Sequence, residues 1–439
     1  MNHSKKWSKK AISMALVAAM VGTSVMPTFA ASTDPNASAK REATNAAISQ
    51  KAATQGMVLL ENNNNSLPIA QTKGTKVALF GVGSYKTIKG GTGSGDVYLK
   101  DGANITVEQG FEDAGYDVVN QDFLTAQNTA YEKAESEAGS GGMFSSFVYK
   151  EEAYAEADVT AAAGKTDTAI YVLARNSGEG ADRKAEKGDY YLTDNEAANL
   201  KLLGQKFKNV VVVLNTGGIV DTNFFNGKGG YAANDSLNRS KIEGLDSLVL
   251  MSQAGMNGGR ALVQILNGEV NPSGKLVMTM PKSLDQVPAM VFGDFPGRTS
   301  TEEEHERMNA KLTETYREGV FVGYRYYDKY QIPVQFPFGH GLSYTTFSYG
   351  DMQVKEPDGQ TFKVQIPVTN TGKLAGKETV ELYVGEAEVS PENPVKELKG
   401  FCKLSLAPGE TKYAEFELTA DAFRHFDEKT DAWKVIAGS

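Results

Sequence analysis

The sequence predicts an α/β domain, with a mostly parallel sheet sandwiched by helices, followed by a small all-β sandwich. From Lys76 onward, short β-rich runs alternate with amphipathic stretches, as expected for strands joined by helices. The valine run at 210–213 suits a strand that is buried on both faces. After residue 345 the chain changes to short alternating runs separated by Gly, Pro and Asn, a pattern typical of an antiparallel sandwich.

The α/β domain is expected to span residues 45–285. Its strands are predicted at runs rich in β-branched residues: 76–81, 116–120, 168–175, 209–216, 245–251 and 276–280. Helices are predicted at the amphipathic stretches between them: 107–114, 123–138, 194–208 and 259–266. Because strands and helices alternate in this order, we expect helices above and below one sheet.

A connecting segment is predicted at 286–344, with a charged helical piece from Glu302 and then an aromatic-rich stretch. Loose linkers seldom carry so many aromatic residues, so we expect this segment to pack against the rest of the chain. The all-β domain is predicted at 345–439, with its final strand at 433–436. The chain ends where a returning strand would be expected, so we expect this domain to be incomplete.

The first thirty residues form a separate segment. Lys5, Lys6, Lys9 and Lys10 precede an apolar run and the small-residue stretch ending at Ala30 and Ala31, which is the layout of a secretory signal peptide over 1–30. The alternative is a membrane anchor, but the run is shorter than the roughly 20 residues that span a bilayer. We therefore expect a secreted or cell-surface protein without a membrane span.

Charge and composition exclude several classes of function. Removal of the predicted signal peptide, which holds four Lys and no acidic residue, moves the formal charge from −9 to −13, so nucleic acid would be repelled. The single Cys excludes thiolate zinc clusters and iron–sulfur centres. The four His show no paired metal-ligand spacing, which predicts no metal or cofactor and leaves only oxygen-ligated calcium open.

A glycine-rich loop follows the first predicted strand, from Gly81 to Asp96. A dinucleotide fingerprint fails there because Lys86 occupies the place of its last glycine. A phosphate loop fails because Asp96 stands where Lys is needed, so nucleotide binding is a distant alternative. The loop is either a flexible surface segment or one whose backbone approaches a ligand closely.

A second loop directly follows the predicted strand at 168–175 and contains Glu179 between two glycines. In a parallel sheet both loops leave at the carboxyl edge, where ligands of α/β domains bind. A carboxyl group with free space around it suits a general acid. The alternative is a solvated surface glutamate, with Asp182 and Arg183 pairing with each other or with neighbours to brace the loop.

These residues resemble glycoside hydrolase family 3, the large β-glucosidase and β-xylosidase family. The loop from Ser177 to Arg183 matches the family's acid/base pattern S-G-E-G-x-D-R. The resemblance covers nearly everything after residue 45 and includes the family's α/β sandwich domain, the junction that follows it and its fibronectin type III-like domain. The matching segments are 56–62 with 67–69, 258–262 with Gly268, 271–276, 316–319 with 322–327, 336–345, 369–372 with Gly376, 383–384 and 396–401.

The resemblance implies a retaining hydrolase of β-linked oligosaccharides or glycosides. Family members with this loop take an acid/base Glu from the sandwich domain and an Asp nucleophile from a (β/α)8 barrel. The resemblance therefore implies that Glu179 is the acid/base, and that Gly93, Ser94, Asp182 and Arg183 lie near the substrate. It also identifies the all-β domain as fibronectin type III-like.

The sequence departs from the family in one large respect. Nothing in it resembles the barrel, and no S-D-W or S-D-Y segment supplies a nucleophile. Asp182 is three residues from Glu179, and one short loop is unlikely to place two carboxyls about 5–5.5 Å apart on opposite sides of a glycosidic bond. We expect a barrel in cis or in trans, as in permuted members of the family, and a nearly inert isolated chain.

The alternative function is a non-catalytic exported module that binds carbohydrate or lies at the cell surface. It predicts saturable sugar binding that survives replacement of Glu179.

Overall fold

The computed structural model describes residues 37–99, 103–139, 147–176, 183–289, 317–358, 361–385 and 390–435. The predicted signal peptide and the charged piece from Glu302 lie outside these residues. Within the described residues, no helix combines the length and apolar character needed to cross a membrane. The first described helix is α2 (Ala37–Gly56), which the sequence analysis did not predict. It is rich in alanine, the residue with the highest helix propensity.

A six-stranded sheet forms the centre of the α/β domain, with strand order β1-β6-β5-β4-β2-β3. Five of its strands are parallel to one another and confirm the predicted mostly parallel sheet: β2 (Lys76–Phe80), β3 (Asp117–Val118), β4 (Thr168–Arg175), β5 (Asn209–Thr216) and β6 (Ser247–Leu250). The edge strand β1 (Val58–Asn62) runs antiparallel to β6.

The strand predicted at 276–280 is wrong as a member of this sheet. Only β7 (Met280–Pro281) forms there, and it pairs antiparallel with β8 (Val334–Phe336). Val277 is 76% exposed, so this apolar run is not a buried core strand. Proline also lacks the amide hydrogen that an interior sheet position needs.

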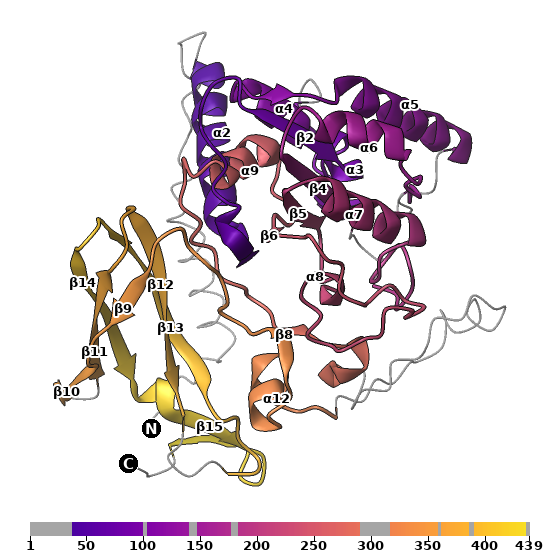
Figure 1. Ribbon diagram of the computed structural model, residues 1–439. Helices are drawn as coiled ribbons and strands as arrows, with labels where there is room; N and C mark the ends of the chain where they lie inside the picture. The colour runs from indigo at the N-terminus through magenta and orange to yellow at the C-terminus, as the bar shows by residue number, and fades with distance from the viewer. Residues whose placement is uncertain are drawn as a thin grey trace, which may run out of the picture. The chain divides into compact units, whose positions relative to one another are not determined.

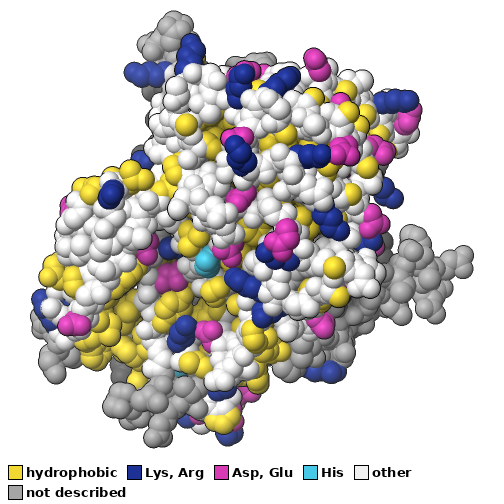
Figure 2. Space-filling model, in the orientation of Figure 1, with side chains coloured by type: hydrophobic (Ala, Val, Ile, Leu, Met, Phe, Trp, Pro, Cys, Tyr) yellow, Lys and Arg dark blue, Asp and Glu magenta, His cyan; other side chains and the backbone are white. Residues whose placement is uncertain are grey.

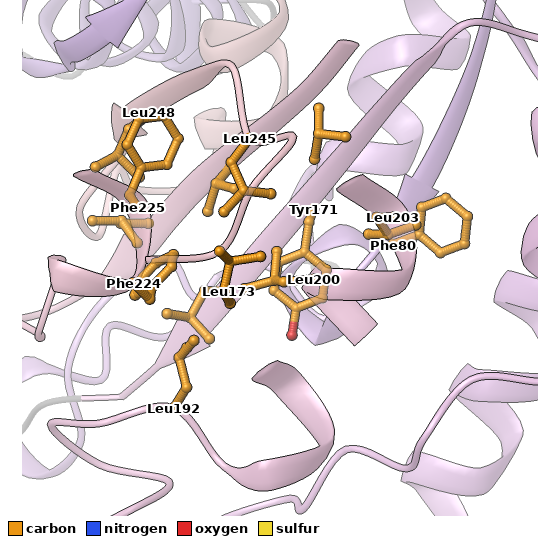
Figure 3. Packing of buried hydrophobic residues seen from close by; sticks show 14 of the residues in the cluster. Phe80, Tyr171, Leu173, Leu192, Leu200, Leu203, Phe224, Phe225, Leu245 and Leu248 are labelled. Atoms are coloured by element: carbon orange, nitrogen blue, oxygen red, sulfur yellow. The ribbon is translucent and has the colours of Figure 1, made fainter. Parts of the chain in front are cut away.

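Helices cover both faces of the sheet, as predicted (Figure 1). On one face α6 (Glu156–Ala163) and α7 (Asp194–Lys206) pack against the even-numbered valines of β5, and on the other α4 (Val107–Asp113) and α9 (Gly258–Leu266) pack against its odd-numbered valines. This alternation explains why all of 210–213 is apolar. Figure 3 shows part of the first cluster, with Tyr171 from β4 among Leu173 and Leu200.

The shorter helices complete the domain. Helix α5 (Gln121–Ala138) begins two residues before its predicted start, while α6, α3 (Val82–Tyr85) and α8 (Asn223–Asn226) were not predicted. Each of these three helices has eight residues or fewer, too short for an amphipathic period to stand out in the sequence.

The C-terminal domain consists of antiparallel β-sheets, as predicted. One sheet contains β9 (Phe347–Tyr349), β10 (Gln353–Asp358), β11 (Thr361–Asn370) and β14 (Thr411–Thr419). A second contains β12 (Gly376–Val384) and β13 (Glu397–Leu406). Alternating residues of these strands, including Val364, Val380 and Phe416, form one core. The predicted last strand is present as β16 (Ala432–Val435), paired with β15 (Arg424–Asp427).

The described part of the connecting segment, 317–344, is packed, as predicted. It contains α12 (Tyr324–Lys329), whose Tyr324 hydroxyl accepts a 2.8 Å hydrogen bond from the Leu398 amide. Lys329 donates to the carbonyls of Ser390 and Asn393. Basic and acidic side chains are interspersed over the face shown in Figure 2, without a continuous basic patch.

Candidate active site

The carboxyl edge of the sheet brings together loops that are far apart in sequence. Strands β2, β4, β5 and β6 are parallel, so the loops that follow them leave at the same edge. Asn215, fully buried in β5, accepts a 2.7 Å hydrogen bond from the Ile88 amide and donates to the carbonyls of Ile88 and Ser252. One side chain thus ties the glycine-rich loop after β2 to the loop after β6.

The glycine-rich loop begins with a close backbone approach. Gly81 has a φ of 80°, and a Cβ there would lie 2.5 Å from the carbonyl oxygen of Val172 on β4. Only glycine fits such a turn without displacing the neighbouring strand. The Gly81 amide donates a 2.9 Å hydrogen bond to the Tyr154 hydroxyl, which fixes the start of the loop.

Farther along this loop, Gly93 begins a short 3₁₀ helix, Gly93–Gly95, that includes the backbone of Ser94. Asp96 pairs with Lys89 at 2.5 Å, and the Lys89 carbonyl accepts from the Gly255 amide at 2.9 Å. The Asp96 charge is therefore balanced within the loop. Beyond it Tyr98 is 89% exposed.

The stem that leads into the predicted acid/base loop ends in a buried ion pair. Arg175, the last residue of β4, donates from Nη1 and Nη2 to the two carboxylate oxygens of Glu196 at 2.7 and 2.6 Å. Burial alone would lower the pKa of Arg175, but the Glu196 carboxylate holds that pKa above its ordinary value. Glu196 also accepts from the Thr193 amide in the capping box of α7. The end of β4 is thereby fixed to the start of a helix.

The stem that leaves the loop is held by a second ion pair. Arg183 Nη1 donates to Asp189 Oδ1 at 2.6 Å, and the Lys184 amide donates to Asp189 Oδ2 at 2.7 Å. The sequence left open whether Arg183 pairs with Asp182 or with neighbours, and Asp189 is such a neighbour, while Asp182 lies outside the described residues. Nε and Nη2 of Arg183 are buried and meet no acceptor in the described parts of the chain. They are donors that a substrate hydroxyl or a carboxylate can use.

Glu179 and Asp182 themselves lie outside the described residues. Their flanks are described: Asn176 accepts a 3.3 Å hydrogen bond from Gln253 in the loop after β6, and a Cβ placed on Gly218, in the loop after β5, would lie 3.6 Å from Arg183 Nε. The loop that carries Glu179 therefore leaves and returns at the edge that also holds the glycine-rich loop. This shared edge is the one predicted from the parallel sheet.

A buried polar cluster below this edge was not predicted. The Glu151 carboxyl accepts hydrogen bonds from the hydroxyls of Tyr154 and, at 2.6 Å, Tyr171. Burial raises the pKa of Glu151 to about 7, and the nearby Glu196 carboxylate adds to the rise. Tyr154 also accepts from the Gly81 amide, so the cluster connects β4 to the first turn of the glycine-rich loop. The sequence carries no signal for it, because its members come from separate segments.

Two cavities among the described residues lie elsewhere. One, of about 390 Å³, is lined by residues such as Lys76 and Asp117 at the amino ends of β2 and β3. The other, of about 380 Å³, is lined by residues such as Asn226 and Asp246 near the amino end of β6. We place the candidate site at the carboxyl edge instead, because the loops with suitable chemistry meet there. The described residues contain no group of three or more His, Cys, Asp or Glu that could hold a metal ion.

The fold and the site define an α/β domain, covered by helices on both faces and with the flanks of the Glu179 loop at its carboxyl edge, that is followed by an antiparallel β domain. The description of the glycosyl hydrolase family 3 C-terminal domain matches residues 57–324, and that of a fibronectin type III-like domain matches 378–439. The chain belongs to glycosyl hydrolase family 3.

Individual relatives agree with this assignment. The chain is 33% identical to beta-glucosidase A of Butyrivibrio fibrisolvens, over 89% of this chain and 48% of that protein. It is also 33% identical to thermostable beta-glucosidase B of Acetivibrio thermocellus, over 89% of this chain and 45% of that protein. The solved structure of beta-glucosidase 3B from Thermotoga neapolitana with glucose matches with a TM-score of 0.74 at 33% identity, over 88% of this chain and 50% of that one. The chain thus spans about half the length of these relatives.

Proposed function

We propose that this chain supplies the general acid/base, Glu179, of a retaining β-glucosidase-type hydrolase, whose nucleophile comes from a (β/α)8 barrel in cis or in trans. The observation that carries the proposal is the placement of both flanks of the Glu179 loop at the carboxyl edge, beside the glycine-rich loop. The relatives named above are beta-glucosidases, which supports a β-linked glycoside or oligosaccharide as the substrate.

The proposed chemistry has two steps. Protonated Glu179 gives its proton to the glycosidic oxygen while the barrel's carboxylate attacks the anomeric carbon, so the glycosidic bond breaks and a glycosyl-enzyme ester forms. Glu179, now ionised, then takes a proton from water, and the resulting hydroxide equivalent attacks the anomeric carbon and releases the barrel's carboxylate. No cofactor or metal is needed, because proton transfer and carboxylate attack account for every bond.

The substrate-site candidates have distinct proposed roles. Gly93 and Ser94 are proposed to let a sugar approach their backbone closely, because glycine adds no side chain there. Arg183 offers its two unpartnered donors to a sugar hydroxyl or to a carboxyl of the loop. Asp182 has no proposed catalytic step, because Glu179 and the barrel's nucleophile account for both carboxyl groups that retention requires. We further propose that residues 1–30 direct export, which amino-terminal sequencing of the mature protein tests.

The test of the proposed function uses the protein that contains both this chain and its barrel. Hydrolysis of phenyl β-glucoside, whose leaving group needs protonation, is compared between the wild type and Glu179→Gln. We expect kcat/KM to fall by about 10²–10⁴-fold, because the variant cannot donate the proton. With 2,4-dinitrophenyl β-glucoside, whose leaving group needs little protonation, the fall in the glycosylation rate should be far smaller.

Glu186→Gln is the matched control, because Glu186 is 62% exposed in a neighbouring turn. It should leave both rates unchanged. Wild-type hydrolysis of the phenyl glucoside by Glu179→Gln would overturn the proposal. Saturable sugar binding by the isolated chain, unaffected by Glu179→Gln, would favour the non-catalytic module instead.

A further inference from the structure

We propose that Asp189 is a positioning residue for Glu179, because it binds both stems of the loop that carries this carboxyl group. The inference rests on the proposed function, which makes Glu179 the acid/base. The Asp189 clamp consists of Arg175 on the incoming stem, Arg183 and Lys184 on the outgoing stem, and Asp189 between them.

Each stem is bound by a different part of Asp189. Its backbone carbonyl accepts a 3.1 Å hydrogen bond from Arg175 Nε, on the incoming stem. Its carboxylate accepts from Arg183 Nη1 at 2.6 Å and from the Lys184 amide at 2.7 Å, on the outgoing stem. The bond from the Arg183 guanidinium is charge-assisted on both sides, which makes it roughly twice as strong as a neutral one. One residue therefore sets the separation of the loop's two ends.

Asp189 is itself held firmly. The adjacent Tyr190 and Tyr191 are 2% and 5% exposed, and their rings pack edge-on at 5.0 Å. The Asp221 amide donates to the Tyr190 carbonyl at 2.9 Å, and the Gly188 amide donates to the Tyr191 carbonyl at 2.8 Å. On the other side, Glu196 fixes the Arg175 guanidinium. The Asp189 clamp therefore anchors both ends of the loop to buried residues of the α/β domain.

The Asp189 clamp affects the position of the proton donor more than the stability of the protein. Fixing both ends of a loop reduces the number of conformations open to the residues between them. General acid catalysis depends on where the proton donor lies relative to the substrate, since a misplacement of about 1 Å can cost about 10²-fold in rate. If the salt bridge had a purely structural role, its loss would instead lower the stability of the protein and slow the hydrolysis of all substrates alike.

The first arm of the test uses this chain alone. Hydrogen–deuterium exchange is measured for Asp189→Asn, for the wild type and for Glu186→Gln, whose exposed carboxylate lies 4.0 Å from Lys184 in the same turn. In Asp189→Asn we expect the amide of Lys184, which donates to the Asp189 carboxylate, to exchange at least about 10-fold faster, while those of β5 stay unchanged, because the opening is local. Exchange equal to that of the wild type would overturn the clamp, whatever Glu179 does.

The second arm uses the protein with its barrel and the two aryl glucosides. Asp189→Asn should lower kcat/KM for phenyl β-glucoside by about 10-fold or more and leave that for 2,4-dinitrophenyl β-glucoside within about 2-fold. An equal loss for both substrates would mean a structural role only and would overturn the assignment.

Parallel measurements on Glu179→Gln distinguish a failure of the proposed function of Glu179 from a failure of the positioning role of Asp189. If Glu179→Gln discriminates between the substrates and Asp189→Asn does not, the inference about Asp189 fails alone. If Glu179→Gln itself does not discriminate, the proposed function fails, and the assignment of Asp189 as its positioning residue fails with it.

Discussion

The α/β domain and the fibronectin type III-like domain bury polar groups in different ways. In the α/β domain Glu151, Arg175, Glu196 and Asp221 are at most 9% exposed and lie near the carboxyl edge, while Asp246 is buried at the opposite edge. In the described part of the fibronectin type III-like domain, the buried polar side chains are neutral, with Asn370 fully buried.

This difference in buried charge is what the proposed function would lead us to expect, because it places the chemistry in the α/β domain. Buried charges are costly unless they are paired and hydrogen-bonded, so their concentration beside the loops of one edge needs a reason. Titratable groups with strongly shifted pKa values gather at functional sites, and Glu151 and Asp221 both have a pKa raised to about 7 by burial. The three variants below test the contrast between the two domains.

The largest effect on stability is expected for Glu196→Ala. This variant leaves the Arg175 guanidinium buried without its carboxylate and removes the capping box of α7, so unfolding of the α/β domain should become easier by about 3–5 kcal/mol. Urea unfolding followed by circular dichroism measures the change. Asp194→Ala is the control, because Asp194 is 75% exposed and its pair with Lys187 is worth about 1 kcal/mol at most. Equal costs for the two variants would contradict the account.

A pH-dependent effect of up to about 3 kcal/mol is expected from Glu151. Its pKa rises from 4.5 in the unfolded chain to about 7 in the folded chain, mainly through burial. The folded state therefore binds the proton more tightly, and the corresponding stability is present below pH 4.5 and is lost as the pH rises through about 7.

Glu151→Gln should flatten much of this decline in the free energy of unfolding between pH 5 and pH 8. Part of it should remain, because Asp221 behaves in the same way. The neighbouring exposed residue provides the control variant Glu152→Gln, which should keep the wild-type profile. A profile for Glu151→Gln that overlays the wild type would show that this carboxyl does not titrate in the predicted range.

The smallest effect is expected in the fibronectin type III-like domain. Asn370 accepts from Thr345 Oγ1 and the Gly372 amide and donates to the carbonyls of Leu374 and Leu406. Asn370→Ala should therefore cost about 2 kcal/mol, without a pH dependence, because no charge is involved. Thr369→Ala, which removes the exposed Thr369–Thr411 hydrogen bond, should cost less than about 0.5 kcal/mol. A cost for Asn370→Ala that varies between pH 5 and pH 8 would contradict this contrast.

Local pattern was enough to predict much of the fold. The bounds of β4 and β5 agree with the sequence prediction at both ends, because strands that are buried on both faces have continuous apolar sequences. The shared edge of the two loops followed from parallel pairing alone. The run at 276–280 was assigned wrongly because its partner, β8, lies more than fifty residues away and no local signal shows that pairing.

The candidate site was predictable only where one segment carried the chemistry. The Glu179 loop was identifiable because its pattern is contiguous. Asp189, Glu196 and Glu151 were missed because each acts through a contact with a different segment, which only the folded chain brings close. A glutamate in a polar stretch looks solvent-exposed until its partners are known.

Under the proposed function, this chain holds the proton donor for cleaving a sugar linkage, and the group that attacks the sugar carbon comes from a barrel. The most direct measurement is hydrolysis of 2,4-dinitrophenyl β-glucoside by the isolated chain, with Glu179→Gln beside it. The account predicts rates close to the uncatalysed background for both proteins. Rapid turnover by the wild-type chain would contradict it, whether or not Glu179→Gln is also active, because the chain would then contain its own nucleophile.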